Sequence, residues 1–351
     1  MKTEIIKLDK FKIEMDKLHY AADVLREGGL VAFPTETVYG LGANALDPAA
    51  VQKIFTAKGR PSDNPLIVHI SDRQALSELV NIIPDNAYEV MKCFWPGPIT
   101  LVLEKSPNVP DIITAGLNTV AVRMPSHPIA LALIKEAGIP IAAPSANTSG
   151  KPSPTDASHV IEDLTGRVDV ILDGGPTAIG LESTVLDLTE KTPVILRPGG
   201  VTIEQLREIL GKVETDPALK EKDVIGLIPK SPGMKYTHYS PKADVIIIEG
   251  RLEAVVQKIN SLCRQYAIQG ILVGVLTTEQ TKGLYLSKEI ICMGDRENPV
   301  TIAANLFRAM REFDQRGVRV ILAEAVEASG IGMAIMNRMS KAAGYNIIKA
   351  D

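Results

Sequence analysis

The chain has 351 residues, which is more than one hydrophobic core usually serves, so two domains are expected. Its net charge of −4 disfavours a protein that works mainly on DNA or RNA, because such proteins usually have a basic balance. Only 4% of the residues are aromatic, which also disfavours a binder that stacks single-stranded bases on aromatic rings. A basic cluster in such a chain suits a small anion better.

The three cysteines, Cys93, Cys263 and Cys292, are widely spaced and form no Cys-x-x-Cys or Cys/His set. This pattern disfavours a disulfide framework or a zinc site and favours a reducing compartment. The charged N-terminus lacks the apolar segment of a secretory signal, and no apolar run approaches the ~20 residues of a membrane span. We therefore expect a cytoplasmic protein that has no contact with a membrane and no metal site of its own.

The first part of the chain mixes helix and strand patterns without a strict βαβ alternation. Helices are predicted at 17–29, 49–59, 71–80 and 128–138, the last with Pro at its start and Gly at its end. Strands are predicted at 30–35, 66–70, 99–104, 119–124, 140–145, 168–173 and 183–188. This mixture predicts an α/β domain with a large mixed sheet.

The chain changes character between about 211 and 243, where it is charged, contains four prolines and shows little periodicity. This segment is predicted to be a linker or a functional cover. After it, strand patterns at 243–250, 270–277 and 318–325 alternate with helix patterns at 251–267 and 299–317, as in a small Rossmann-like domain. No G-x-G-x-x-G follows the first of these strands, so dinucleotide binding is not indicated. The expected parts are 1–210, a linker at 211–243 and 244–351.

The first segment with functional side chains is 33–45, which contains Thr35 and Thr37. If the segment is extended, residues two apart share one face, so the two hydroxyls would lie together. Gly40 and Gly42 would allow the backbone to approach a ligand or a neighbouring strand closely. A plain turn with strand-forming threonines explains the segment equally well.

The second segment, 58–70, contains Lys58, Arg60, Asn64 and His69. The helix dipole already favours cations at a helix end, and a lone histidine in an apolar strand is more often a core residue. However, two cations around a glycine also suit a polyphosphate, to which Arg offers bidentate donors and Lys a point charge. Both interpretations stay open at this point.

Arg123 lies near the end of the strand predicted at 119–124, where it is either exposed on an edge or directed into a cleft. Arginine is the usual anchor for a carboxylate. The loop at 140–155 offers Ser145, Asn147 and Ser153, which suit the ribose or phosphates of a nucleotide. A plain Pro/Ser loop is the simpler interpretation of that segment.

Ser183 begins one strand, and Arg197 ends the next one before a Pro-Gly-Gly turn. The sequence has no G-x-S-x-G, no classical P-loop and no evident pair of acid and base carboxylates. A reaction that depends on positioning and charge neutralisation, such as phosphoryl or nucleotidyl transfer, therefore fits better than one that needs a strong general base.

Together these segments resemble the Sua5/YrdC/YwlC family, the threonylcarbamoyl-AMP synthases. The matching segments, in chain order, are 34–45, 58–70, 95–103, 119–128, 140–155, 180–185 and 196–199. Segments 231–241 and 330–344 further resemble the long, two-domain Sua5 form, so the resemblance covers nearly the whole chain. It implies a YrdC-like catalytic domain with a twisted mixed sheet, followed by the Rossmann-like Sua5 C-terminal domain.

The resemblance implies a nucleotidyltransferase reaction. L-threonine and bicarbonate form a carbamate, its carboxylate attacks the α-phosphorus of ATP, and pyrophosphate leaves L-threonylcarbamoyladenylate behind. Other proteins of the tRNA threonylcarbamoyl-transfer machinery then pass the group to adenosine 37 of tRNA, giving N6-threonylcarbamoyladenosine. Mg²⁺ is expected with the triphosphate, and a weak contact with RNA is a further expectation.

The resemblance also implies roles for single residues. Threonine would be held by Thr35, Thr37, His69, Arg123 and Ser183, with Arg123 taking its carboxylate. ATP would be held by Lys58, Arg60, Asn64, Thr119, Ala143 through its backbone, Ser145, Asn147, Ser153, Arg197 and Tyr236. Lys58 and Arg60 are the catalytic candidates, because they would offset charge on the leaving phosphates. Tyr236 and residues 238–239 would belong to a linker that closes the site as a lid.

Two alternative functions remain. A double-stranded RNA-binding module would use a concave basic face of the same fold, since RNA duplexes are recognised by shape and phosphates. The acidic net charge disfavours this as the main role. The carbamoyl-transfer domain of hydrogenase-maturation proteins has the same fold, but those chains carry an acylphosphatase-like segment and Cys-rich zinc fingers, which this sequence lacks.

Overall fold

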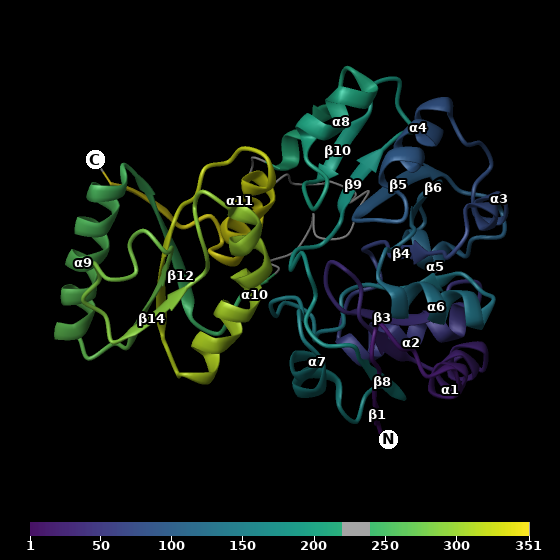
Figure 1. Ribbon diagram of the computed structural model, residues 1–351, viewed down its shortest axis with the longest axis horizontal. Helices are drawn as coiled ribbons and strands as arrows, with labels where there is room; N and C mark the ends of the chain where they lie inside the picture. Colours follow the sequence, from purple (N-terminus) through teal and green to yellow (C-terminus); the bar gives the residue numbers. More distant parts are fainter. Residues whose placement is uncertain (220–238, 351) are drawn as a thin grey trace. The chain divides into compact units, whose positions relative to one another are not determined.

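The computed structural model describes residues 1–219 and 239–350. These residues form two compact units, which are described separately (Figure 1). The described part of the N-terminal unit is 1–149 and 153–219, and that of the C-terminal unit is 150–152 and 239–350. The domain boundaries expected at 210 and 243 stay predictions.

An eleven-stranded mixed sheet forms the frame of the N-terminal unit, which confirms the predicted α/β domain. Its strand order is β1-β8-β2-β3-β7-β4-β6-β5-β9-β10-β11. Two parallel pairs, β4–β6 and β5–β9, lie in its middle part, and β5 and β6 join them in antiparallel fashion. The strands are β1 (Glu4–Lys7), β2 (Val31–Phe33), β3 (Gly40–Asn44), β4 (Ile67–His69), β5 (Ile99–Glu104), β6 (Thr119–Arg123), β7 (Ile141–Ala142), β8 (Val170–Asp173), β9 (Thr184–Asp187), β10 (Val194–Arg197) and β11 (Glu214–Thr215).

Helices cover this sheet and supply much of its core. Leu18 and Leu25 of one helix and Leu133 of another pack on Phe33 and Leu172 of the sheet, and all five side chains are fully buried. The apolar spacing of 3.6 residues on these helices explains why the same face stays buried over several turns. The helices are α1 (Met15–Arg26), α2 (Pro48–Lys58), α3 (Leu76–Leu79), α4 (Asp85–Phe94), α5 (Asp111–Thr114), α6 (Pro128–Ala137), α7 (Ala157–Leu164) and α8 (Ile203–Leu210), with short 3₁₀ turns η1 (Arg73–Ala75) and η2 (Pro217–Leu219).

Strand β3 approaches its neighbours so closely that Gly42 has no room for a side chain. A Cβ at this position would lie 2.8 Å from the ring of Phe33 and 2.9 Å from Ile141. The close backbone approach predicted for this glycine is confirmed, and the neighbour is protein rather than a ligand. The approach brings the loop before β3 next to the loop after β7, where Gly40 forms a bridge with Ser145.

Two predicted elements are shorter in the structure, for local reasons. The helix expected at 71–80 is only η1 followed by α3, and it ends at Val80, which leaves helical geometry to form a bridge with Lys105. The strand expected at 140–145 keeps only Ile141 and Ala142. Prolines flank it at 140 and 144, and a proline cannot donate to the strand ladder.

A five-stranded parallel sheet forms the frame of the C-terminal unit, as expected for a Rossmann-like domain. Its order is β14-β13-β15-β12-β16. Figure 1 shows α9 on one face of this sheet and α10 and α11 on the other. The elements are β12 (Asp244–Gly250), α9 (Leu252–Ile268), β13 (Val273–Thr277), β14 (Glu289–Cys292), α10 (Pro299–Gln315), β15 (Val320–Glu324), α11 (Ile331–Ala342) and β16 (Ile347–Ala350). Within 1–219 and 239–350, no helix combines the length and the apolar character needed to cross a membrane.

Candidate functional site

The ends of two parallel strands place His69 and Arg123 side by side. Strand β4 pairs with β6 so that these two residues are register partners, and each is the last residue of its strand. Both are buried, with 3% and 4% of their surface exposed. Arg123 is therefore directed into the protein and is not an exposed edge residue.

A directed chain of hydrogen bonds holds the Arg123 guanidinium. Its Nη1 donates to Thr37 Oγ1 at 2.9 Å, and Thr37 Oγ1 lies 2.8 Å from Thr35 Oγ1. Thr35 donates its own proton to the carbonyl of Val38 at 2.6 Å, so the Thr37 hydroxyl must donate to Thr35. The segment is turned rather than extended, because Thr35 Oγ1 also accepts from the backbone N–H groups of residues 37 and 38.

Glu36 also lies in this cluster, and the sequence analysis missed it. The residue is 8% exposed, and its Oε1 lies 2.7 Å from Arg123 Nη2. The distance is that of an ion pair, but the N–H groups of Arg123 are not aligned with the carboxylate as a hydrogen bond requires. Within the described residues neither carboxylate oxygen has a hydrogen-bond partner, and neither do Nε and Nη2 of Arg123. The sequence carried one signal for such a partner: a lone arginine lies in an apolar strand, and a buried charge is normally paired.

The electrostatics of the cluster favour a neutral imidazole at His69. Burial, together with the neighbouring Arg123 charge, lowers the pKa of His69 to about 3. Its ring stands edge-on to Phe33, with centroids 6.3 Å apart, and Nδ1 lies 3.3 Å from the carbonyl of Ile67. Because a carbonyl oxygen can only accept, Nδ1 carries the proton in this contact.

A second neutral imidazole lies near the cluster. His127 caps the N-terminus of α6, where its side chain accepts from the backbone N–H of Ile129. Burial lowers its pKa to about 4, and the nearby charge of Glu36 opposes this shift. Accepting that N–H requires an unprotonated Nδ1, so the cap and the low pKa agree.

Ser183 reaches the same region from the start of β9. Its Oγ lies 2.8 Å from Thr100 Oγ1, and Thr100 is the register partner of Arg123 on β5. Arg197, the last residue of β10, donates Nε and Nη2 to the carbonyl of Ser183 at 3.1 and 3.0 Å. The structure thus brings the five residues predicted for threonine into one region, together with Thr100, which sequence analysis missed.

Lys58 links helix α2 to the loop that follows β7. Its side chain is 3% exposed, so it is not the solvated cation that a helix end alone would explain. Its Nζ donates to the carbonyl of Ser145 and, at 2.5 Å, to that of Asn147. The backbone N–H of Ser149 donates to the Lys58 carbonyl at 2.8 Å. Segments that are almost ninety residues apart in the sequence therefore share one set of contacts.

Arg60 and Asn64 lie in the turn that follows α2. Arg60 Nη2 donates to the carbonyls of Asn64 and Pro65 at 3.2 and 3.3 Å. The Asn64 side chain is 1% exposed, and neither its amide nitrogen nor its oxygen has a hydrogen-bond partner among the described residues. Buried amides normally have hydrogen-bond partners, so this side chain has unused capacity to donate and accept.

Ser153 and Ala143 are the residues predicted for the nucleotide on the side of the Pro/Ser loop. Ser153 is fully buried and donates to Glu182 at 2.5 Å, a partner that sequence analysis did not identify. The backbone N–H of Ala143 is used by the carbonyl of Ile67 at 2.9 Å, so a ligand can meet only its carbonyl.

Thr119 is not brought to the region around Arg123. Thr119 begins β6, whereas Arg123 ends it, so four residues of strand separate them by about 13 Å. Tyr236 and the predicted lid around 238 lie outside the described residues. Tyr239 is described, and its ring stacks on Phe307 with centroids 5.2 Å apart.

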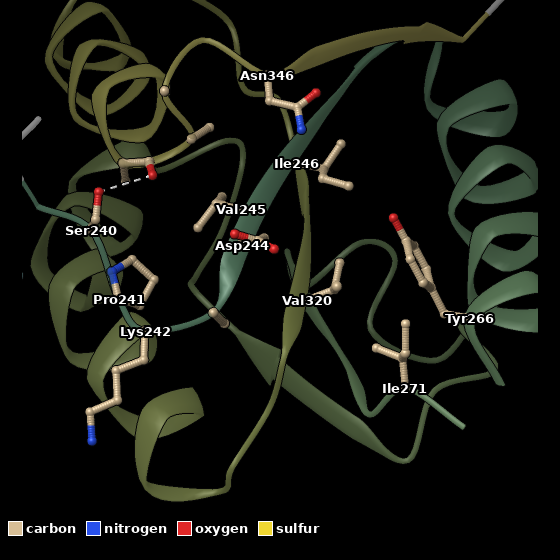
Figure 2. Close-up of a pocket in the computed structure, with 14 residues that line it drawn as sticks. Ser240, Pro241, Lys242, Asp244, Val245, Ile246, Tyr266, Ile271, Val320 and Asn346 are labelled. Atoms are coloured by element: carbon tan, nitrogen blue, oxygen red, sulfur yellow. Dashed lines mark hydrogen bonds between the residues drawn. The ribbon is translucent and has the colours of Figure 1, made fainter. Parts of the chain in front are cut away.

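A cavity of about 500 Å³ in the C-terminal unit differs in character from this cluster (Figure 2). Its wall includes the apolar side chains of Val245, Ile246 and Val320. Figure 2 shows Lys242 pointing away from Asp244, so these two charged residues do not form a pair. The Arg123 cluster is therefore the better candidate site.

Comparisons with known proteins cover almost the whole chain. The Sua5–YciO–YrdC family model, described as telomere recombination, matches residues 23–199. A second model, described as threonylcarbamoyl-AMP synthase, C-terminal domain, matches residues 201–344.

Two relatives and one solved structure are similar over nearly their full length. The threonylcarbamoyl-AMP synthase of Pyrococcus abyssi is 54% identical over 96% of this chain and 97% of its own. The enzyme of that name from Bacillus subtilis is 52% identical over 97% of each chain. A crystal structure of P. abyssi Sua5 complexed with L-threonine has a TM-score of 0.94 at 53% identity, covering 99% of this chain and all of that one.

Proposed function

Because the chain belongs to the Sua5/YrdC/YwlC family, we propose that it is a threonylcarbamoyl-AMP synthase of the nucleotidyltransferase class. The reaction condenses L-threonine, bicarbonate and ATP to L-threonylcarbamoyladenylate and pyrophosphate. Its product serves the N6-threonylcarbamoyladenosine modification of tRNA. Similarity over both units supports the assignment, because it is not confined to one fold element.

The observation that carries the proposal is the buried edge of Arg123. Nε and Nη2 are adjacent donors in one plane, and they make no hydrogen bonds with the described residues, although Nη2 is in ion-pair contact with Glu36. Such an edge binds a carboxylate through two parallel hydrogen bonds. Thr37 fixes the guanidinium through its remaining nitrogen, so the edge is preorganised. We assign the carboxylate of threonine to Arg123, and we assign the rest of the amino acid to Thr37, neutral His69 and Ser183, with Thr35 bracing Thr37.

We assign the nucleotide to the contacts around Lys58. This residue carries a positive charge and also holds the backbone of the loop at 145–149, so it would shape the nucleotide site and offset charge in it. Two of the other predicted contacts, Arg60 and Asn64, lie in the turn that follows α2. Ser153 lies in the Pro/Ser loop that follows β7. Thr119, Ala143, Ser145, Asn147, Arg197 and Tyr236 remain predicted ATP contacts.

In the reaction, an oxygen of the carbamate forms a bond to the α-phosphorus while the bond from that phosphorus to the bridging oxygen breaks. The electron pair of the broken bond leaves with pyrophosphate. Cations that are already in place stabilise this developing charge without reorganising, which is the role proposed for Lys58 and Arg60.

Mg²⁺ is expected to enter the site with the triphosphate. It usually keeps several waters and binds through substrate phosphates with few protein carboxylates. The described residues contain no group of three or more His, Cys, Asp or Glu side chains arranged to hold a metal ion. When bound, the ion would neutralise phosphate charge beside Lys58.

We further propose a cytoplasmic location and transfer of the adenylate to the tRNA threonylcarbamoyl-transfer machinery. The three cysteines are all free, and Cys93 is exposed, which suits a reducing compartment. A contact with RNA itself is expected to be weak, because the chain carries a net charge of −4.

The assignment can be tested by following the product. Purified protein is incubated with ATP, ¹⁴C-bicarbonate and ³H-threonine, and the nucleotides are separated by chromatography. One adenylate peak that carries both labels is expected. Consumption of ATP with no doubly labelled adenylate would contradict the proposal.

A further inference from the structure

Glu36 is a buried carboxylate whose oxygens accept no hydrogen bond from the described part of the chain. Its side chain is 10% exposed, and both oxygens lack a hydrogen-bond partner among the described residues. Its contact is the ion pair with Arg123, at 2.7 Å from Oε1 to Nη2. Buried carboxylates normally accept several hydrogen bonds, so this arrangement leaves Glu36 able to accept a donor from outside the described residues, such as a bound ligand.

The neighbouring polar groups do not supply that donor. The Thr37 hydroxyl donates to Thr35. Nδ1 of His127 accepts from a backbone N–H, so its Nε2 carries the proton, but that N–H makes no hydrogen bond to either Glu36 oxygen. Ser183 lies against Thr100 and Arg197. Among the described residues, Nε and Nη2 of Arg123 have no hydrogen-bond partner, although Nη2 is in the ion pair with Glu36, and they form the edge assigned to the carboxylate of threonine.

An α-amino acid presents one cation and one anion on the same carbon atom. The pair formed by Arg123 and Glu36 offers the complementary charges at the same short separation. We propose that Glu36 binds the α-ammonium group of threonine, so that the Arg123–Glu36 pair recognises the zwitterion as a unit. This inference rests on the proposed function and adds a specificity-determining residue to it.

The assignment is also compatible with the next chemical state of the ligand. When the nitrogen becomes a carbamate it keeps one N–H, which can still donate to Glu36. The new carboxylate is repelled by the Glu36 charge, so it is disfavoured on that side of the nitrogen. Glu36 therefore helps to orient the carbamate as well as the amino acid.

The test compares two ligands that differ only in the group assigned to Glu36. L-threonine and (R)-3-hydroxybutanoate share the carboxylate, the methyl group and the hydroxyl, but the second lacks the amine. Calorimetry gives Kd for both with the wild-type protein, with Glu36→Gln and with Glu89→Gln. The last is a control that removes one exposed acid from α4.

We expect wild type and E89Q to bind threonine about 10- to 100-fold more tightly than the analogue, the effect of one charge-assisted hydrogen bond. E36Q should lose most of this preference, with Kd for the analogue unchanged or lower and Kd for ATP unchanged. Equal weakening of both ligands in E36Q would overturn the inference, because Glu36 would then only position Arg123. An unchanged preference would also overturn it.

The wild-type protein provides a test that does not depend on the variant folding. If it binds the two ligands with equal Kd, no ammonium subsite exists and the inference fails. If it binds no threonine at all, the proposed function fails instead. The two failures are therefore distinguishable.

Discussion

Arg123 shows how a single charged residue can be kept in a protein interior. Glu36 balances its charge, Thr37 accepts one of its N–H groups, and the neighbouring His69 is neutral. Breaking such a pair by removing one partner leaves an uncompensated buried charge, which is strongly destabilising. A substitution that keeps the charge separates this structural role from ligand binding.

Arg123→Lys should therefore fold but bind threonine poorly. Lysine keeps the ion pair with Glu36 but cannot offer two parallel donors to a carboxylate. We expect KM for threonine to rise at least about tenfold, from the loss of one charge-assisted hydrogen bond, with a small change in Tm. Steady-state kinetics and thermal unfolding test this, and an unchanged KM would contradict the assignment of the carboxylate.

The low pKa of His69 predicts a loss of stability in acid. The unfolded chain takes up a proton near pH 6.5, whereas the folded chain resists protonation until about pH 3. Stability from this group is thus fully present above pH 6.5 and decreases as pH falls toward 3.

Urea unfolding at pH 7.5 and pH 5.0 should reveal this effect. We expect wild type to lose about 2 kcal/mol of unfolding free energy from His69 between these pH values. His69→Gln should lose less over the same range. Equal losses in the two proteins would show that His69 does not resist protonation in the folded state.

At the scale of elements, the sequence predicts strands and helices well where the residues that define them are close together in the chain. The strand at 99–104 is observed as Ile99–Glu104, and the helix at 128–138 as Pro128–Ala137, because apolar runs and Pro/Gly signals mark their ends. The helix at 71–80 is mostly lost, because a bridge to Lys105 in another segment competes with it. Long-range pairing of this kind leaves no mark in a short window of sequence.

In the candidate site, too, local features could be predicted from the sequence and long-range contacts could not. His69 and Arg123 are recognisable as unusual polar residues at strand ends. That they are register partners across β4 and β6 is visible only in the folded structure. Glu36 and Thr100 were missed because each lies inside a segment whose local pattern has a simpler explanation. Their importance appears only when Arg123 and Ser183 are placed beside them.

The link from α2 to the loop after β7 predicts a large effect of Lys58→Met. This change removes a buried cation and two hydrogen bonds to loop carbonyls. We expect kcat/KM for ATP to fall by about 100- to 1,000-fold, as for loss of one preorganised donor.

Lys53→Met is the matched control for that measurement. Lys53 lies on the same helix, and its exposed side chain donates to the carbonyl of Gly28 at 2.7 Å. Its activity should stay near that of wild type. Similar losses in both variants would show that the helix is disturbed and that Lys58 has no special role.

At the scale of the whole molecule, the charge balance separates the enzyme from an RNA-binding module. Non-specific binding to nucleic acid depends on neutralising phosphates and typically has Kd of about 10⁻⁴ to 10⁻⁶ M at physiological salt. With a net charge of −4, we expect double-stranded RNA to bind no more tightly than this. Filter binding across a salt series tests it, and nanomolar, steeply salt-dependent binding without ATP turnover would favour the RNA module.

The central claim is that the two-unit chain activates a threonine-derived carbamate with ATP. Its most direct test is the release of pyrophosphate from ATP with bicarbonate, measured with and without L-threonine. The account predicts release that requires threonine and reaches its full rate only when all three substrates are present. Pyrophosphate release that is the same without threonine would contradict it.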